Sequence, residues 1–319
     1  MNLKIGAAVG IAFIITFGAL YLAINFSNES EERKNKHKEI LSQINLNENK
    51  ILFLGSSHIG HLNMTHIINN ISDNNPEFTI YNLAENGNSP KLRYNDLNKI
   101  IELNPKIVFY GISYRDFNQS IKSINSQNEI LDIKTHIEDA TPEEIKDINP
   151  QFLTRKAIRT ILDESGIFQK PTYDINPPNT PFFSLSNIQT EVIEESELKR
   201  QLLIISPTPS KIKIDKENNF ELEKFGYIIE RLQNEDIEIV VFTTPLSRTY
   251  LDEIPESVKK SFRDILDDLA KQNGIKIYEF EERYADKHIW NNLDHIAYNN
   301  KAIIFSDEVI EMILQEVNP

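Results

Sequence analysis

Five short apolar runs, each long enough for one strand, constrain the fold of this chain more than any other feature. They are ILFL from Ile51, FTIYNL from Phe78, KIVFY from Lys106, IEIVVFTT from Ile237 and IKIYEF from Ile275. Runs rich in Ile and Val without polar alternation are typical of strands buried on both faces. Such strands occur mainly in parallel sheets, because the crossover connections place helices on both faces.

Helical patterns separate or follow these runs. They begin at Lys91, Phe220, Ser257 and Asn300 and read KLRYNDLNKIIEL, FELEKFGYIIERLQ, SVKKSFRDILDDLAKQ and NKAIIFSDEVIEMILQEV. Strands that alternate with helices predict the α/β class, as a three-layer α/β/α fold with a central parallel sheet. Ligands of such folds bind at the carboxyl ends of the strands.

The N-terminal region predicts a membrane anchor. The stretch from Ile5 to Ile24 carries no charge, and at about 1.5 Å rise per residue it matches a hydrocarbon core of roughly 30 Å. A cleavable signal peptide is the alternative, but its apolar region is usually shorter, about 7 to 15 residues. We therefore expect a transmembrane helix at residues 1–26, a charged stalk at 27–49 and the folded domain at 50–319.

The residues on either side of this anchor give two opposing indications of its orientation, and we favour an extracytoplasmic domain. A short tail before a single span resembles a signal anchor, which predicts an extracytoplasmic domain. The positive residues after the span favour the opposite orientation; they are Arg33, Lys34, Lys36 and Lys38.

The alternation of strands and helices breaks between about residues 118 and 215. This segment holds a helix-capping signature, TPEE, at Thr141, a helical pattern, LTRKAIRTIL, and a Pro-rich stretch, KPTYDINPPNTPFF. We expect an insertion that caps one end of the sheet, where specificity is commonly set.

Composition excludes several classes of function. The 319-residue chain has a net charge of −14, so it lacks the positive charge with which proteins bind nucleic acid. Its 40% hydrophobic content, with 17 Phe and 11 Tyr, is enough for a substantial core. With no cysteine, the chain has no disulfide, thiolate nucleophile or Cys zinc site.

Three of the ten glycines stand just after predicted strands. Gly55, Gly87 and Gly111 each follow one of the first three apolar runs by a few residues. Glycine allows the backbone to turn sharply or to approach a ligand closely. Each alone is compatible with an ordinary loop, but together they indicate a site at this edge of the sheet.

Four short blocks resemble, in order, the motifs of the SGNH hydrolase superfamily (GDSL-like). They are LGSSH at Leu54, NLAENGNSP at Asn82, VFYGISYRDF at Val108 and NNLDHIAYNNKA at Asn291. By position, the resemblance implies Ser57 as nucleophile, Gly87 as an oxyanion-hole donor beside the Ser57 N–H, and His295 as general base. These roles suit the chemistry, since a serine hydroxyl needs an imidazole to take its proton and an oxyanion needs fixed backbone donors.

The chain departs from the family pattern at two positions. Ser113 stands where the family has an oxyanion-hole Asn, and loss of one such donor typically costs about 100- to 1,000-fold in rate. Asn292 stands where the family has the Asp three residues before the base. Asp294 can orient the imidazole of His295 if the local backbone folds back, and Asp116 is another candidate.

The resemblance extends to membrane-anchored, extracytoplasmic members that handle O-acyl groups on cell-wall polymers and exopolysaccharides. It implies hydrolysis or transfer of an ester-linked acyl group, expected to be acetyl, on a surface glycan, through an acyl-enzyme on Ser57. Arg115 and Asp116 are expected to contact substrate, and no metal or organic cofactor is needed. The alternative is a catalytically degenerate domain that binds surface glycan or scaffolds a cell-envelope assembly, which Ser113 and Asn292 favour.

Simpler explanations exist for several of these residues. Ser57 can be a helix N-cap, and Ser56 can serve equally well as nucleophile or cap. The histidines His58, His61 and His66 include a His-x-x-His pair, which suggests metal, but the pair has no third ligand in register. Arg115 and Asp116 can also form a structural ion pair.

Overall fold

The computed structural model describes residues 49–85, 87–119, 190–202, 205 and 208–318. These residues belong to one of two compact units of the chain, the unit that comprises residues 40–122 and 175–319. The transmembrane helix predicted at 1–26, nearly all of the stalk and most of the insertion at 118–215 lie outside the described residues. In the part that is described, no helix combines the length and the apolar character that a membrane span requires.

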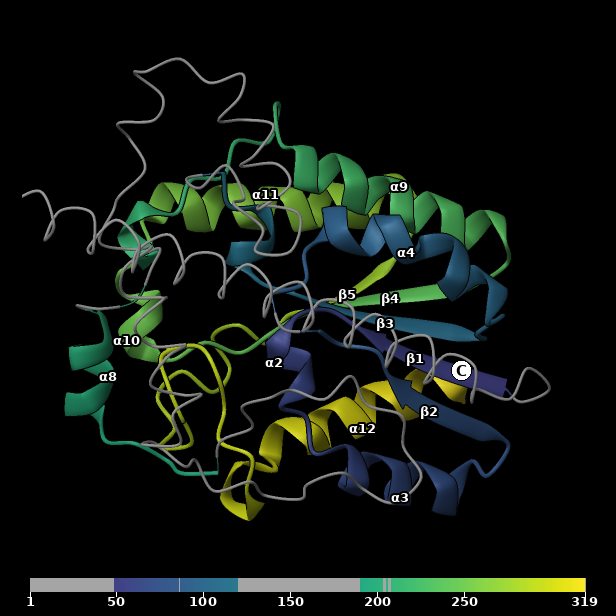
Figure 1. Cartoon of the computed structure of the whole chain (residues 1–319), viewed down its shortest axis with the longest axis horizontal. Coiled ribbons are helices and arrows are strands. Elements are labelled where there is room, and N and C mark those ends of the chain that lie inside the picture. Colours follow the sequence, from purple (N-terminus) through teal and green to yellow (C-terminus); the bar gives the residue numbers. More distant parts are fainter. Residues whose placement is uncertain (1–48, 86, 120–189, 203–204, 206–207, 319) are drawn as a thin grey trace, which may run out of the picture. The chain divides into compact units, whose positions relative to one another are not determined.

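A parallel sheet in the order β2-β1-β3-β4-β5 forms the centre of this unit (Figure 1). Every neighbouring pair is parallel, as the apolar runs predict. The five strands are β1 (Asn49–Leu54), β2 (Phe78–Asn82), β3 (Ile107–Ile112), β4 (Glu238–Thr243) and β5 (Lys276–Tyr278).

Helices cover both faces of the sheet, which confirms the predicted α/β class for the described residues (Figure 1). One face carries α4 (Pro90–Glu102), α9 (Phe220–Asn234) and α11 (Glu256–Asn273), and the other carries α3 (Met64–Asn74) and α12 (Ile304–Val317). The shorter elements are α2 (Ser57–Gly60), η1 (Tyr114–Phe117), α8 (Glu195–Leu202), η2 (Pro209–Lys211), α10 (Arg248–Leu251) and η3 (Asn300–Ala302).

Burial on both faces explains why the strand sequences do not alternate. All six residues of β3 are buried, and Phe53 of β1 stacks on Phe109 of β3 with ring centroids 5.3 Å apart. Phe242 of β4 meets Phe53 edge-on. These rings share one face of the sheet, and the complete burial of β3 shows that the other face is covered as well, as expected for a sheet between two helical layers.

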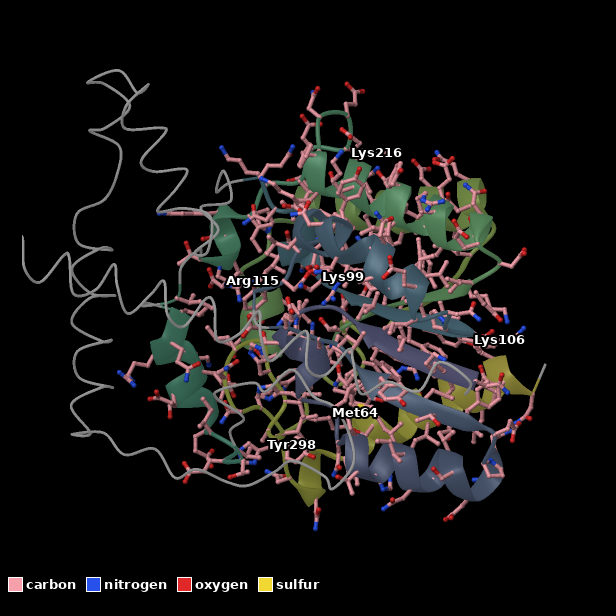
Figure 2. All side chains as sticks on the ribbon, turned by 45° about the vertical axis from the view of Figure 1, so that its right-hand side comes forward. Met64, Lys99, Lys106, Arg115, Lys216 and Tyr298 are labelled. Carbon is pink, nitrogen blue, oxygen red and sulfur yellow. The ribbon has the colours of Figure 1, made fainter. Side chains whose placement is uncertain are left out.

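The chain reverses the direction of its crossovers between β1 and β3. The segment after β1 leads to α3 on one face, whereas the chain after β3 returns through α9 on the other (Figure 1). Such a switch point leaves a crevice at the carboxyl ends of the two strands. Lys106 and Arg115 flank β3, and Figure 2 shows them at opposite ends of the sheet, with Arg115 at the carboxyl end.

Two glycines make this crevice possible. Gly55 has φ +137°, and a Cβ there would lie 2.6 Å from the Gly111 carbonyl oxygen. A Cβ on Gly111 would lie 2.0 Å from Ile59 Cδ1. Because glycine has no side chain at these two positions, α2 can pack directly against the ends of β1 and β3. Ser57, the first residue of α2, is placed at the crevice by this contact.

Candidate active site

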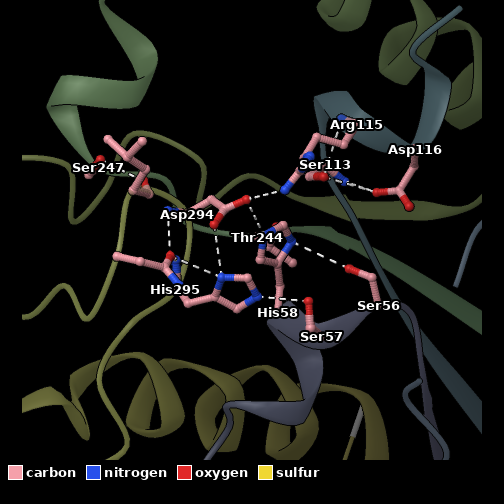
Figure 3. Close-up of polar contacts among 12 residues, drawn as sticks. Ser56, Ser57, His58, Ser113, Arg115, Asp116, Thr244, Ser247, Asp294 and His295 are labelled. Atoms are coloured by element: carbon pink, nitrogen blue, oxygen red, sulfur yellow. Dashed lines mark hydrogen bonds and ion pairs between the residues drawn. The ribbon is translucent and has the colours of Figure 1, made fainter. Parts of the chain in front are cut away.

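Ser57 and His295 are in direct contact at the carboxyl edge of the sheet. The Ser57 hydroxyl lies 2.7 Å from His295 Nε2, although 238 positions separate the residues in sequence (Figure 3). This is hydrogen-bond distance for a nucleophile and its base. Ser56 differs, because its hydroxyl lies 3.4 Å from His58 Nδ1 and makes no capping hydrogen bond to α2. The geometry favours Ser57 over Ser56 as the nucleophile.

The loop that carries His295 folds back on itself. Trp290 and Ile296 form an isolated antiparallel bridge, and the Asn291 N–H donates to the His295 carbonyl at 2.9 Å. The Ser247 hydroxyl holds the middle of the loop by donating to the Leu293 carbonyl at 2.6 Å. Because the loop folds back in this way, the Asp294 carboxylate can reach the ring of the adjacent His295.

Asp294 and Asn292 both face His295 Nδ1. The Asp294 Oδ1 atom lies 2.8 Å from Nδ1 and the Asn292 Oδ1 atom 3.0 Å from it. Asn292 Oδ1 also accepts the backbone N–H groups of Asp294 and His295, at 3.0 and 2.8 Å, which fixes the orientation of its amide. Two oxygen acceptors at Nδ1 require the proton there. Nε2 of His295 is therefore left with its lone pair towards Ser57, the tautomer that a general base needs.

A salt bridge secures the other oxygen of Asp294. Arg115 Nη1 donates to Asp294 Oδ2 at 2.5 Å, and the Asp294 side chain is only 5% exposed. Burial alone would raise the pKa of Asp294, but the charges of His295 and Arg115 hold that pKa well below its ordinary value. Burial lowers the pKa of His295, and Asp294 opposes this shift. Arg115, predicted to contact substrate, thus contacts the carboxylate that orients the base.

Ser113 and Asp116 form a capping box at the end of β3. The Ser113 N–H and hydroxyl both donate to Asp116 Oδ2, at 2.6 and 3.0 Å, and the Ser113 Oγ accepts from the Arg115 N–H at 3.3 Å. Burial raises the pKa of Asp116 to about 7, against the Ser113 hydrogen bonds. The single hydroxyl proton of Ser113 is therefore committed to Asp116 in this structure. Arg115 pairs with Asp294 and not, as one interpretation of the sequence had it, with Asp116.

Gly87 lies in the exposed turn after β2, with φ +68°. The Glu85 N–H donates to the Gly55 carbonyl at 3.2 Å, so this turn is held beside the loop that carries Ser57. A positive φ suits glycine and allows the peptide N–H to face a ligand. Its role as an oxyanion donor stays a prediction.

Two further histidines lie beside the proposed base, and the sequence did not predict that they would contact it. The ring of His295 lies 4.6 Å from that of His58 and 4.7 Å from that of His61, centroid to centroid. His61 Nδ1 donates to the Ile296 carbonyl at 3.0 Å. His66 instead pairs with Asp307 at 2.6 Å. The His-x-x-His spacing was the available signal, because His58 in α2 and His61 at the C-cap of α2 both lie against the ring of His295.

One group of possible metal ligands occurs among the described residues. Polar atoms of His58, Asp294 and His295 lie within 4.8 Å of one another. His295 Nε2 faces the Ser57 hydroxyl, and Asp294 is already neutralised by Arg115. The cluster is therefore explained by hydrogen bonds and an ion pair, and the donors do not require a cation.

Acidification is expected to destabilise the fold through His61. Burial, with the nearby charge of His295, lowers the pKa of His61 from 6.5 to about 3. Below about pH 6.5, His61 binds a proton in the unfolded chain but stays unprotonated in the folded chain. The free energy of unfolding therefore falls as pH falls. His61→Asn keeps a donor for the Ile296 carbonyl but does not titrate.

Urea unfolding at pH 7 and pH 4 measures this effect. We expect the acid-induced loss of stability to be about 2 kcal/mol smaller in His61→Asn than in the wild type. His288→Asn is the matched control, because the His288 side chain is 63% exposed. Equal losses in the wild type and His61→Asn would contradict the assignment.

A scan against protein-family models and a search of curated proteins give no match to this chain. Among solved structures, similar folds include an acetyl xylan esterase, with 10% sequence identity, a TM-score of 0.45, and 83% of this chain and 99% of that chain covered. A lipase/acylhydrolase from Enterococcus faecalis has 9% identity and a TM-score of 0.44, covering 84% of this chain and 95% of its own. A catalytic mutant of an acetylxylan esterase from Geobacillus stearothermophilus has 10% identity and a TM-score of 0.43, covering 85% and 94%. These similarities do not assign an activity to the chain.

Proposed function

We propose that this protein is a serine esterase or O-acyltransferase of the SGNH type that forms an acyl-enzyme on Ser57. The observation that carries the proposal is the continuous hydrogen-bonded series from the Ser57 hydroxyl through His295 to Asp294, with contacts of 2.7 and 2.8 Å. A nucleophile, a base in the correct tautomer and a buried carboxylate are the parts that acyl transfer requires.

The reaction follows from these positions. Ser57 Oγ attacks the acyl carbonyl while its proton passes to His295 Nε2, and Asp294 stabilises the imidazolium that forms. The tetrahedral intermediate collapses as His295 returns the proton to the departing alkoxide, which leaves the acyl group on Ser57. His295 then removes a proton from water or an acceptor hydroxyl, whose oxygen attacks the acyl carbon. The second tetrahedral intermediate collapses as His295 returns this proton to Ser57 Oγ, which regenerates the free enzyme.

The oxyanion would be stabilised by backbone donors alone. The Ser57 N–H opens α2 and so has no acceptor within that helix, and the Gly87 N–H is the second proposed donor. Because the Ser113 hydroxyl donates to Asp116, it supplies no third donor in this arrangement. A two-donor site is expected to be slower than one with a third, side-chain donor, by about 100- to 1,000-fold.

For the substrate, we propose an ester-linked acetyl group on a surface glycan. The basis is the sequence resemblance and the apolar segment at residues 5–24, which is long enough to anchor the domain in a membrane. The alternative, a glycan-binding or scaffolding domain without turnover, is favoured by the committed Ser113 hydroxyl.

Acetate release tests the proposal. Purified full-length protein in detergent is incubated with p-nitrophenyl acetate and with O-acetylated oligosaccharides, and acetate is measured with and without an added unacetylated acceptor. Turnover that depends on Ser57 supports the esterase, and acetyl transfer to the acceptor supports the transferase. Absence of turnover on every ester, together with glycan binding, would favour the binding domain.

A further inference from the structure

His58 is a buried histidine beside the proposed triad that the reaction above does not use. It follows Ser57 in α2 and is 7% exposed. Its Nδ1 atom faces two hydroxyls, Thr244 Oγ1 at 3.2 Å and Ser56 Oγ at 3.4 Å. Its Nε2 atom lies 3.5 Å from Asp294 Oδ2 (Figure 3) and has no hydrogen-bond partner within the described part of the chain.

The surroundings of His58 determine its tautomer. A lone pair on Nε2 would face the Asp294 carboxylate and be repelled, whereas an N–H there is attracted to it. The hydroxyls of Thr244 and Ser56 can then donate to Nδ1. His58 therefore carries a proton on Nε2, and this N–H is directed at the oxygen of Asp294 that Arg115 also contacts.

The contact between His58 and Asp294 is close to a hydrogen bond. At 3.5 Å it exceeds the usual range for N–H···O by a few tenths of an ångström. A cavity of about 10 Å³ borders His58, His61, Asp294 and His295.

We propose that His58 is a positioning residue that, together with Arg115, holds the Asp294 carboxylate in line with His295. This inference rests on the proposed acyl transfer, in which His295 becomes cationic and needs Asp294 in place. With Arg115 and His58 on Oδ2, the Oδ1 atom of Asp294 remains directed at His295 Nδ1. The ring of His58 also lies against that of His295, which limits rotation of the base.

The charged and titratable groups around His295 come from three segments. Asp294 belongs to its own loop and Arg115 to η1, whereas His58 lies in α2 and His61 is the C-cap of α2. His58 is one of the groups that lower the pKa of His295, so removing His58 raises the pKa of His295. Loss of a donor to Asp294 acts in the same direction, because a less satisfied carboxylate attracts the imidazolium more strongly.

Two substitutions separate positioning from packing. His58→Leu fills the space without a donor, and His58→Gln restores an N–H near the place of Nε2. On p-nitrophenyl acetate, we expect His58→Leu to lower kcat/KM by about 10-fold, the size of one charge-assisted hydrogen bond, mainly through kcat. The acid limb of its pH profile should move to higher pH, and His58→Gln should recover most of the rate. His66→Gln is the control, since His66 pairs with Asp307 away from the site.

An NMR titration of the His295 ring makes the test independent of turnover. In the full-length protein we expect His295 to titrate at higher pH in His58→Leu than in the wild type, with His58→Gln between them. An inactive wild type that still shows this order would refute the proposed function while supporting the role of His58. An unchanged titration, or equal losses of rate in the Leu and Gln variants, would overturn the positioning role.

Discussion

Ser57→Ala is expected to lower kcat for ester cleavage by about 10,000-fold or more, the range found when a nucleophile of a hydroxyl-imidazole-carboxylate site is removed. The reason is covalent: without Oγ no acyl-enzyme forms, and His295 has no hydroxyl to activate. Substrate affinity should change little, because the hydroxyl reacts with the ester but contributes little to binding it. Steady-state kinetics on p-nitrophenyl acetate, with circular dichroism to confirm folding, provide the measurement.

Ser56→Ala is the matched control for this prediction. Its hydroxyl lies one residue away but contacts His58 and not His295, so the expected loss is less than 10-fold, as for one weak hydrogen bond. If the two alanine variants lost activity equally, or if Ser56→Ala were the inactive one, Ser57 would not be the nucleophile.

Asp294→Asn is expected to produce the second largest loss, about 10,000-fold in kcat, as for the equivalent change in a serine protease. The amide can turn its NH2 group towards Nδ1 and favour the wrong tautomer of His295. The substitution also removes the negative charge of Asp294, which stabilises the imidazolium and balances the charge of Arg115. Since Asp294 raises the pKa of His295, the acid limb of any remaining activity should move to lower pH.

Asn292→Asp distinguishes the two candidates for the orienting residue. The resemblance implies that an acid is missing at this position, which predicts a large gain in rate when it is supplied. The structure predicts a change of less than about 10-fold, because Asp294 already performs this role and one tautomer is enough. Asn292 Oδ1 mainly holds the backbone N–H groups of Asp294 and His295. A gain of 100-fold or more would show that Asp294 does not orient the base.

The arrangement of the sheet could be predicted because its signals are local. Each strand is an unbroken apolar run, and α4, α9, α11 and α12 show their buried faces by helical spacing. Helix α3 was not predicted, although its apolar residues have helical spacing, because MTHIINNISDN is rich in residues with low helix propensity. It forms because Asn63 caps it and because Met64, Ile67 and Ile71 are buried in the core.

The candidate site was only partly accessible from sequence. Ser57 and His295 stand in recognisable motifs, and the structure brings them together. The pairing of Arg115 with Asp294 joins residues 179 positions apart, and no local pattern encodes that contact. The fold of the His295 loop depends on Ser247 and on the Trp290 bridge, so the choice of Asp294 as the orienting acid follows only from the three-dimensional structure.

Labelling by a fluorophosphonate tests the central claim most directly, because a serine hydroxyl that a neighbouring base activates attacks this reagent far faster than an ordinary serine. Full-length wild type, Ser57→Ala and Ser56→Ala are treated in parallel, and the modified residue is located by mass spectrometry. The account predicts modification of Ser57 in the wild type and in Ser56→Ala, and no modification in Ser57→Ala. A folded wild type that takes no label, or that is labelled at another residue, would contradict it.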